Sequence, residues 1–228
     1  MKLFESFWRK KNADALEKRL KKISGSQEPL PGYLLYPGDP IAQKMFEPHM
    51  KIVSDDRCGY QFKLYTEIAD ITPEIKGQMP AFDINETHIF WKRDSAAWCS
   101  VSTMKGASVK TSSLRKWVEA SDQMALMFGG MIPFLNLPSQ RETGEYRRVT
   151  MYYLGENTSY NKLHGFEETH VYCHVFYLGD QLYKKFILCA KKDTVSWKVE
   201  CTIPSTAEAL SPTDMVPPGL VFGSFFPC

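Results

Sequence analysis

The sequence has no apolar run of the length that crosses a membrane and no uninterrupted apolar stretch near residue 1. A transmembrane helix needs about 18 or more apolar residues, and a secretory signal needs a continuous apolar core. Here Arg9, Lys10 and Lys11 follow directly on Phe7 and Trp8. The chain is therefore predicted to be cytoplasmic, and its six cysteines are expected to be mostly reduced thiols.

Motifs that identify common enzyme classes are also missing. The chain contains no GxSxG, GxGxxG, HExxH or EF-hand pattern, and the run KGASVKTSS lacks the first glycine of a phosphate-binding loop. Adjacent acids occur at residues 55–56 and 167–168, but neighbouring side chains on a strand or turn diverge and seldom work as an acid/base pair. We therefore expect no catalytic residues and no cofactor.

The net charge of +2 is too small for the broad basic surface of a nucleic-acid-binding protein, so no nucleic-acid partner is expected. Charge is nevertheless concentrated in residues 1–24, which hold eight Lys or Arg and three acids. Apolar residues at helical spacing make this segment a predicted basic amphipathic helix. Its Phe4, Phe7 and Trp8 have three interpretations: contact with an anionic membrane surface through residues 1–23, docking on a partner, or packing on the chain's own domain.

Two further segments complete the predicted organisation. Residues 25–48 contain five prolines and three glycines, which predicts a strap or linker and not a regular element. Residues 49–228 are predicted to form one α+β domain, since the chain is 43% hydrophobic and long enough to bury a core. Helical spacing marks residues 112–128 and period-two alternation marks 97–104 and 148–153, so we expect an antiparallel sheet flanked by helices.

The cysteine-rich second half of the chain predicts three paired strands. A turn at Gly-Asp in FYLGDQLY places His170 opposite Cys189, and a further turn within KKDT places Ala190 opposite Val195. Only Lys184 interrupts the core face that results. The apolar members of that face are Val171, Cys173, Val175, Tyr177, Leu182, Phe186, Leu188, Trp197, Val199, Cys201 and Ile203.

Histidines near these strands raise the question of a metal site. His170 and His174 cannot hold one ion, because residues four apart on a strand are separated by about 13 Å. An alternative joins His170 to its cross-strand neighbour Cys189, with His164 from the preceding loop, as metal ligands or as part of an enzyme site. The competing interpretation is that these are half-buried strand residues, since further ligands at motif spacing are missing.

A proline-bounded segment, FGGMIPFLNLP, is unusually apolar for a loop. It is predicted either to cross the core or to form an exposed site for an apolar partner such as a peptide helix. Its apolar side chains are Met131, Ile132, Phe134, Leu135 and Leu137.

Five pieces of sequence follow one another from residue 112 onward: SLRKWVEAS, RRVTMYYLG, THVYCHVFYLGDQLYKKFILCA, SWKVECTIPS and the closing FGSFFP. In this order they resemble the carboxy-terminal half of Mog1/PsbP/DcrB-like proteins. The resemblance implies an antiparallel sheet sandwiched by helices and a protein that binds without catalysing, as in a photosystem subunit, a Ran-binding protein and small bacterial chaperones of that family. The family places a helix before the closing Ser-Phe, where Pro212, Pro217 and Pro218 are expected to interrupt it here.

Together these patterns predict a non-enzymatic cytoplasmic protein-binding module of the adaptor, chaperone or immunity type. It would hold a protein or peptide partner with an apolar surface on a sheet face and on the apolar segment around Phe134. Two alternatives remain open. One is an uncharacterised enzyme or metal-binding protein that uses His164, His170 and Cys189, and the other is a peripheral membrane protein attached through residues 1–23.

Overall fold

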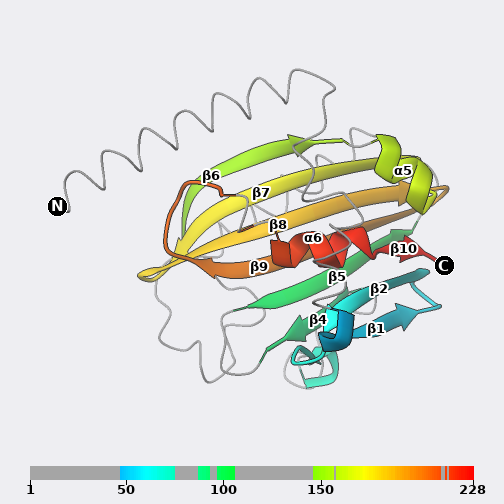
Figure 1. Cartoon of the computed structure of the whole chain (residues 1–228), viewed down its shortest axis with the longest axis horizontal. Helices are drawn as coiled ribbons and strands as arrows, with labels where there is room; N and C mark the ends of the chain where they lie inside the picture. The colour runs from blue at the N-terminus through cyan, green and yellow to red at the C-terminus, as the bar shows by residue number, and fades with distance from the viewer. Residues whose placement is uncertain are drawn as a thin grey trace.

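The computed structural model describes residues 47–74, 87–92, 97–105, 146–156, 158–211, 214 and 216–228. They fold into two antiparallel sheets and a few short helices (Figure 1). The larger sheet has the strand order β3-β4-β5-β9-β8-β7-β6, and the smaller sheet has the order β1-β2-β10. In chain order the elements are η1 (Glu47–His49), β1 (Met50–Asp55), β2 (Tyr60–Tyr65), β3 (Ala69–Asp70), β4 (Thr87–Trp91), β5 (Trp98–Lys105), β6 (Tyr146–Gly155), α5 (Thr158–His164), β7 (Glu168–Leu178), β8 (Gln181–Lys192), β9 (Val195–Ser205), α6 (Val216–Gly223) and β10 (Phe226–Pro227).

The larger sheet consists of two meanders that meet at one strand pair. Strands β3 to β5 form the first meander and β6 to β9 the second, and the antiparallel pairing of β5 with β9 joins them. The antiparallel sheet predicted from period-two alternation is therefore confirmed, and β5 and β6 cover the two strands expected at residues 97–104 and 148–153. Strand β8 is an interior strand of this sheet and is buried on both faces along its apolar run at residues 186–190.

The register of β7, β8 and β9 is correct for one hairpin and wrong for the other. His170 pairs with Cys189 around the turn at Gly179, whose φ of 60° suits a two-residue hairpin turn. Ala190 pairs with Trp197 and not with Val195, because β8 continues to Lys192 and the turn is reduced to residues 193–194. The predicted register of β8 against β9 is shifted by two residues. Because side chains alternate with a period of two, every side chain keeps its predicted face.

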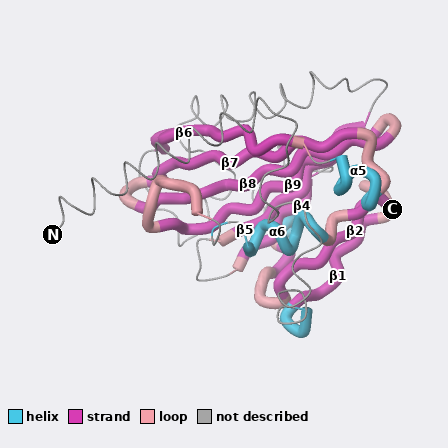
Figure 2. Tube along the Cα trace, turned by 45° about the horizontal axis from the view of Figure 1, so that its top comes forward, coloured by secondary structure: helices cyan, strands magenta, loops and turns pink. Residues whose placement is uncertain are grey.

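One face of the larger sheet forms the core together with the smaller sheet and two helices. Strand β2 alternates strictly, so Tyr60, Phe62 and Leu64 point inward and pack in the same apolar cluster as the core face of β7, β8 and β9. Tyr160 of α5 and Phe222 of α6 belong to the same cluster. Figure 2 shows both short helices on the side of the smaller sheet, and α6 contacts β2 directly.

The opposite face of the larger sheet is also buried, and it carries a charged group. The Glu200 carboxylate lies 3.6 Å from the ammonium groups of both Lys185 and Lys198 and accepts a hydrogen bond of 3.1 Å from the Ser100 hydroxyl. Burial would raise the pKa of Glu200, but the two ammonium groups and the Ser100 hydroxyl outweigh it and lower that pKa to about 2. Glu200 is therefore an ionised carboxylate although its side chain is only 15% exposed.

Helix α6 corrects one expectation from the sequence. Its sequence is VPPGLVFG, and the prolines that were expected to interrupt a helix here stand in its first turn. Backbone N–H groups of a first turn have no partner within the helix, so Pro217 and Pro218 remove no hydrogen bond. The hydroxyl of Tyr160 donates a 2.6 Å hydrogen bond to the carbonyl of Phe222 and ties α5 to α6.

Several predicted features lie outside the described residues. These are the amphipathic helix at 1–24 with Phe4, Phe7 and Trp8, nearly all of the strap at 25–48, the helix at 112–128, and the apolar segment with Met131, Ile132, Phe134, Leu135 and Leu137. In the part of the chain that the structure describes, no helix is both long and apolar enough to span a membrane.

Candidate functional site

A cavity of about 300 Å³ lies where the smaller sheet, the β5–β9 pair and α6 meet. Its wall is mostly apolar, because core-facing residues of β2, β5 and β9 reach it together with two prolines that carry no N–H donor. The apolar residues that line it include Leu64, Ile68, Trp98, Ile203, Pro218 and Val221. A volume of this size is at the lower end of the range for ligand pockets.

Burial keeps two polar side chains in the cavity wall, Tyr65 and Cys201, in their neutral forms. Cys99 and Cys201 stand opposite each other on β5 and β9 with their sulfur atoms 3.7 Å apart. Burial, together with Cys99, raises the pKa of the Cys201 thiol well above its ordinary value. Burial also raises the pKa of Tyr65 to about 12, with a smaller contribution from Cys201. Neither the Tyr65 hydroxyl nor the Cys201 thiol is therefore ionised near neutral pH.

Charged side chains stand at the mouth of the cavity. Lys92 and Glu67 form an ion pair, and their side chains are 44% and 65% exposed, so this end of the cavity reaches the surface. On the same side, the ammonium group of Lys51 donates a 2.6 Å hydrogen bond to the Ile68 carbonyl. An apolar depression with a charged rim results.

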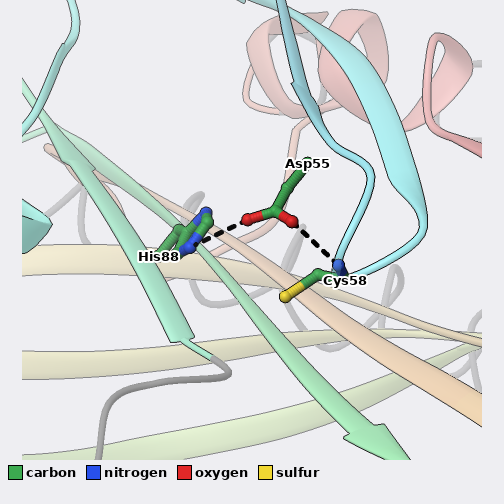
Figure 3. A group of neighbouring side chains, drawn as sticks. All are labelled: Asp55, Cys58 and His88. Atoms are coloured by element: carbon green, nitrogen blue, oxygen red, sulfur yellow. Dashed lines mark hydrogen bonds and ion pairs between the residues drawn. The ribbon is translucent and has the colours of Figure 1, made fainter.

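A second group of side chains gathers at the turn between β1 and β2 (Figure 3). The Asp55 carboxylate lies between the imidazole of His88 and the turn, with Oδ2 3.3 Å from His88 Nε2 and Oδ1 accepting a 2.8 Å hydrogen bond from Cys58 N–H. One donor atom from each of Asp55, Cys58 and His88 lies within 4.8 Å of the others. His88 Nδ1 is 2.6 Å from the hydroxyl of Tyr60.

The surrounding backbone fixes this turn. Trp197 Nε1 donates a 2.9 Å hydrogen bond to the Cys58 carbonyl, and Cys228 N–H donates a 3.1 Å bond to the Gly59 carbonyl. Gly59 has a φ of 68°, in the left-handed region that glycine adopts without strain. Burial opposes ionisation of Asp55, but the Cys58 N–H bond and the charges of His88 and Arg57 outweigh it and lower the pKa of that carboxyl. Asp55 is therefore ionised near neutral pH.

The three residues named from the sequence as alternative metal ligands do not converge. His170 and Cys189 are cross-strand neighbours as predicted, but the ring nitrogens of His170 contact the Tyr153 hydroxyl and the Glu168 carboxylate. His164 Nδ1 donates instead to the Phe225 carbonyl at 2.9 Å. Among the described residues, Asp55, Cys58 and His88 are the only group of three such donors close enough to share an ion.

Sequence reasoning missed this group because its members are far apart in the chain. Asp55 and Cys58 are close in sequence and fit a turn, but His88 belongs to β4 of the larger sheet and reaches Asp55 and Tyr60 only because the two sheets pack together. No spacing between residues that are close in sequence indicates that arrangement. The one sequence feature that pointed to the site was the spacing Asp55-x-x-Cys58 after a strand, and this spacing by itself is common.

Comparisons with known proteins leave the chain without a family. No protein-family model matches the sequence, and no curated protein matches it either. A crystal structure of a protein from Bacteroides thetaiotaomicron VPI-5482 aligns with 75% of this chain at 10% identity and a TM-score of 0.37. This chain spans 45% of the length of that protein. The Mog1/PsbP/DcrB-like resemblance is tested by none of these comparisons and stays a prediction.

Proposed function

We propose that this protein is a non-enzymatic binding module that holds a protein or peptide partner by an apolar side chain inserted into the cavity between the two sheets. The observation that carries the proposal is the apolar cavity with its charged rim. Protein interfaces are commonly built in this way, with one or two large apolar anchors in a central pocket and polar groups around it. The partner is a polypeptide with an exposed Leu, Met or aromatic side chain.

The electrostatics of the cavity favour binding over catalysis. Tyr65 and Cys201 are held in their neutral forms, and the charged groups Lys92 and Glu67 are paired at the mouth. An adaptor, chaperone or immunity protein needs such a site and needs no reactive group. The helix-flanked sandwich of the Mog1/PsbP/DcrB-like family, the cytoplasmic location and the contribution of the apolar segment around Phe134 belong to the same proposal.

The test compares two alanine-to-phenylalanine variants. Ala97 lines the cavity, so Ala97→Phe fills part of it, whereas Ala69→Phe adds the same ring to an exposed position on β3 that does not line it. Peptides with apolar anchors are selected from a displayed random library against the wild-type chain, and their affinities are then measured for both variants. We expect a loss of about tenfold or more for Ala97→Phe, and no change for Ala69→Phe.

Thiol reactivity gives an independent measurement on the same site. Cys99 lines the cavity, so a bound peptide should slow its alkylation, while Cys189, which lies outside it, reports the background. Mass spectrometry of the labelled peptides distinguishes the two positions. Equal affinity for wild type and Ala97→Phe, or unchanged alkylation of Cys99 at saturating peptide, would show that the cavity is not the binding site.

A further inference from the structure

We propose that Asp55, Cys58 and His88 form a binding site for a divalent transition-metal ion of the zinc class. They offer one carboxylate oxygen, one sulfur and one imidazole nitrogen, which is a donor set that Zn²⁺ and Co²⁺ accept. The three atoms already lie within 4.8 Å of one another. Two charged ligands, a thiolate and a carboxylate, would balance the charge of a divalent ion.

The distances are close to those of an occupied site. Ligand atoms 2.0–2.3 Å from a tetrahedral ion are about 3.3–3.8 Å apart from each other. Asp55 Oδ2 and His88 Nε2 are 3.3 Å apart, within that range. The Cys58 sulfur lies within 4.8 Å of a carboxylate oxygen of Asp55 and of a ring nitrogen of His88, so an approach of about 1–1.5 Å at most brings the three donors to the spacing of a bound ion.

The groups around the donors hold them in the orientation that an ion requires. A metal-bound imidazole usually has its second nitrogen fixed by a hydrogen bond, and the Tyr60 hydroxyl is 2.6 Å from His88 Nδ1. When an ion replaces the proton on Nε2, Nδ1–H donates to that hydroxyl and Nε2 presents its lone pair to the ion. Similarly, the Cys58 N–H occupies Asp55 Oδ1 and leaves Oδ2 to bind.

The site is separate from the cavity of the proposed function. Tyr60 and Leu64 stand at opposite ends of β2 and are about 13 Å apart along the strand. None of Asp55, Cys58 and His88 lines the cavity. Three protein ligands leave a fourth tetrahedral position for water or for a donor atom of a bound molecule.

The experiment titrates the reduced, metal-free full chain with Co²⁺ and follows absorption. A thiolate ligand gives a sulfur-to-cobalt charge-transfer band, and tetrahedral coordination gives intense visible bands. We expect one Co²⁺ per chain, displacement by Zn²⁺, and a rise in melting temperature with Zn²⁺ because the ion binds the folded state.

Four variants test the assignment. Cys58→Ala should abolish the charge-transfer band, whereas Cys189→Ala, which removes a buried thiol elsewhere, should leave it intact. Tyr60→Phe removes only the hydroxyl that orients His88 and should weaken Co²⁺ binding about 10–100-fold. Cys228→Ser removes the exposed thiol near the turn and should have no effect on the band.

Circular dichroism checks that each variant folds. If Cys58→Ala does not fold, alkylation of Cys58 in the wild-type chain with and without Zn²⁺ tests the same ligand. Protection of Cys58 by Zn²⁺ supports the site. Absence of a charge-transfer band in the wild type, an unchanged band in folded Cys58→Ala, or loss of the band in Cys228→Ser would each overturn it. In the last two cases the cobalt is held by another thiol, and Asp55 only caps a turn.

Discussion

The buried ion pair between Lys184 and Asp214 allows a quantitative test of the core. Lys184 is on the core face of β8, and its side chain is 1% exposed. Its ammonium group donates 2.6 Å hydrogen bonds to Asp214 Oδ2 and to the Ala209 carbonyl. Asp214 in turn accepts 2.8 Å bonds from the backbone N–H and the hydroxyl of Ser211. The pair therefore fastens the segment after β9 to the sheet.

Asp214→Asn should cost about 3 kcal/mol of unfolding free energy. Removing one partner of a buried pair costs about 3–5 kcal/mol, because a charge is left in the interior without its counter-charge. The lower value applies here, since the Ala209 carbonyl still accepts from Lys184 and the Asp214 side chain is 18% exposed. Lys184→Met removes the more deeply buried charge and leaves an Asp214 carboxylate that is 18% exposed and keeps its two bonds from Ser211, so it should cost less, about 1–2 kcal/mol.

The assay is urea unfolding followed by tryptophan fluorescence, with Trp98 and Trp197 as buried reporters. The double variant Lys184→Met/Asp214→Asn completes the cycle and should be about as stable as Lys184→Met alone. A cost below about 1 kcal/mol for Asp214→Asn would refute the reasoning. So would an equal cost for Asp214→Asn and Lys184→Met, because the asymmetry between them comes from the deeper burial of the Lys184 charge.

Three further predictions concern single residues. Trp197→Ala should cost about 3–5 kcal/mol in the same urea assay, because the ring is 2% exposed; a cost below about 1 would contradict its burial. Glu200 has a folded pKa of about 2 against an ordinary 4.5, so its ionisation contributes about 3 kcal/mol above pH 4.5 that is lost as the pH falls toward 2. Glu200→Gln should therefore flatten the dependence of unfolding free energy on pH in this interval, and an unchanged slope would assign the acid sensitivity to other groups. Gly59→Ala should cost about 1–2 kcal/mol, because φ is 68° and the added Cβ would lie 3.3 Å from the Cys228 carbonyl oxygen; no measurable cost would show that the turn relaxes.

Alternation along the strands was enough to predict the core face of the second meander but not its full register. The pattern decides which side each residue faces, and that prediction holds for Trp197 as for Phe186. The pairing of Ala190 depended on the length of the second turn, which the polar run KKDT left undetermined. A strand extended by Lys191 and Lys192 leaves two turn residues, with Asp193 at a φ of 52°. Asp tolerates that conformation better than most residues, so the tight turn was available to the sequence.

The prediction that prolines interrupt the helix at α6 was wrong because of where they stand in it. Pro217 and Pro218 break a helix only in its interior, and the sequence alone did not show where the helix begins. Because α6 begins at Val216, both rings lie in the first turn and form part of the cavity wall. The same residues therefore stand in the first turn of the helix and add no N–H donor to the cavity wall.

Both candidate sites depend on the contact between the two sheets, which no local pattern reports. The alternation YQFKLY identifies Tyr60 and Leu64 as inward residues, but it does not say what each one meets. Tyr60 meets His88 of β4 because the pairing of β4 with β5 fixes how far His88 extends toward the β1–β2 turn. Leu64 lines the cavity together with Pro217 and Pro218 of α6. The inward residues of one strand thus become parts of two different sites, and the difference lies in their partners from distant parts of the chain.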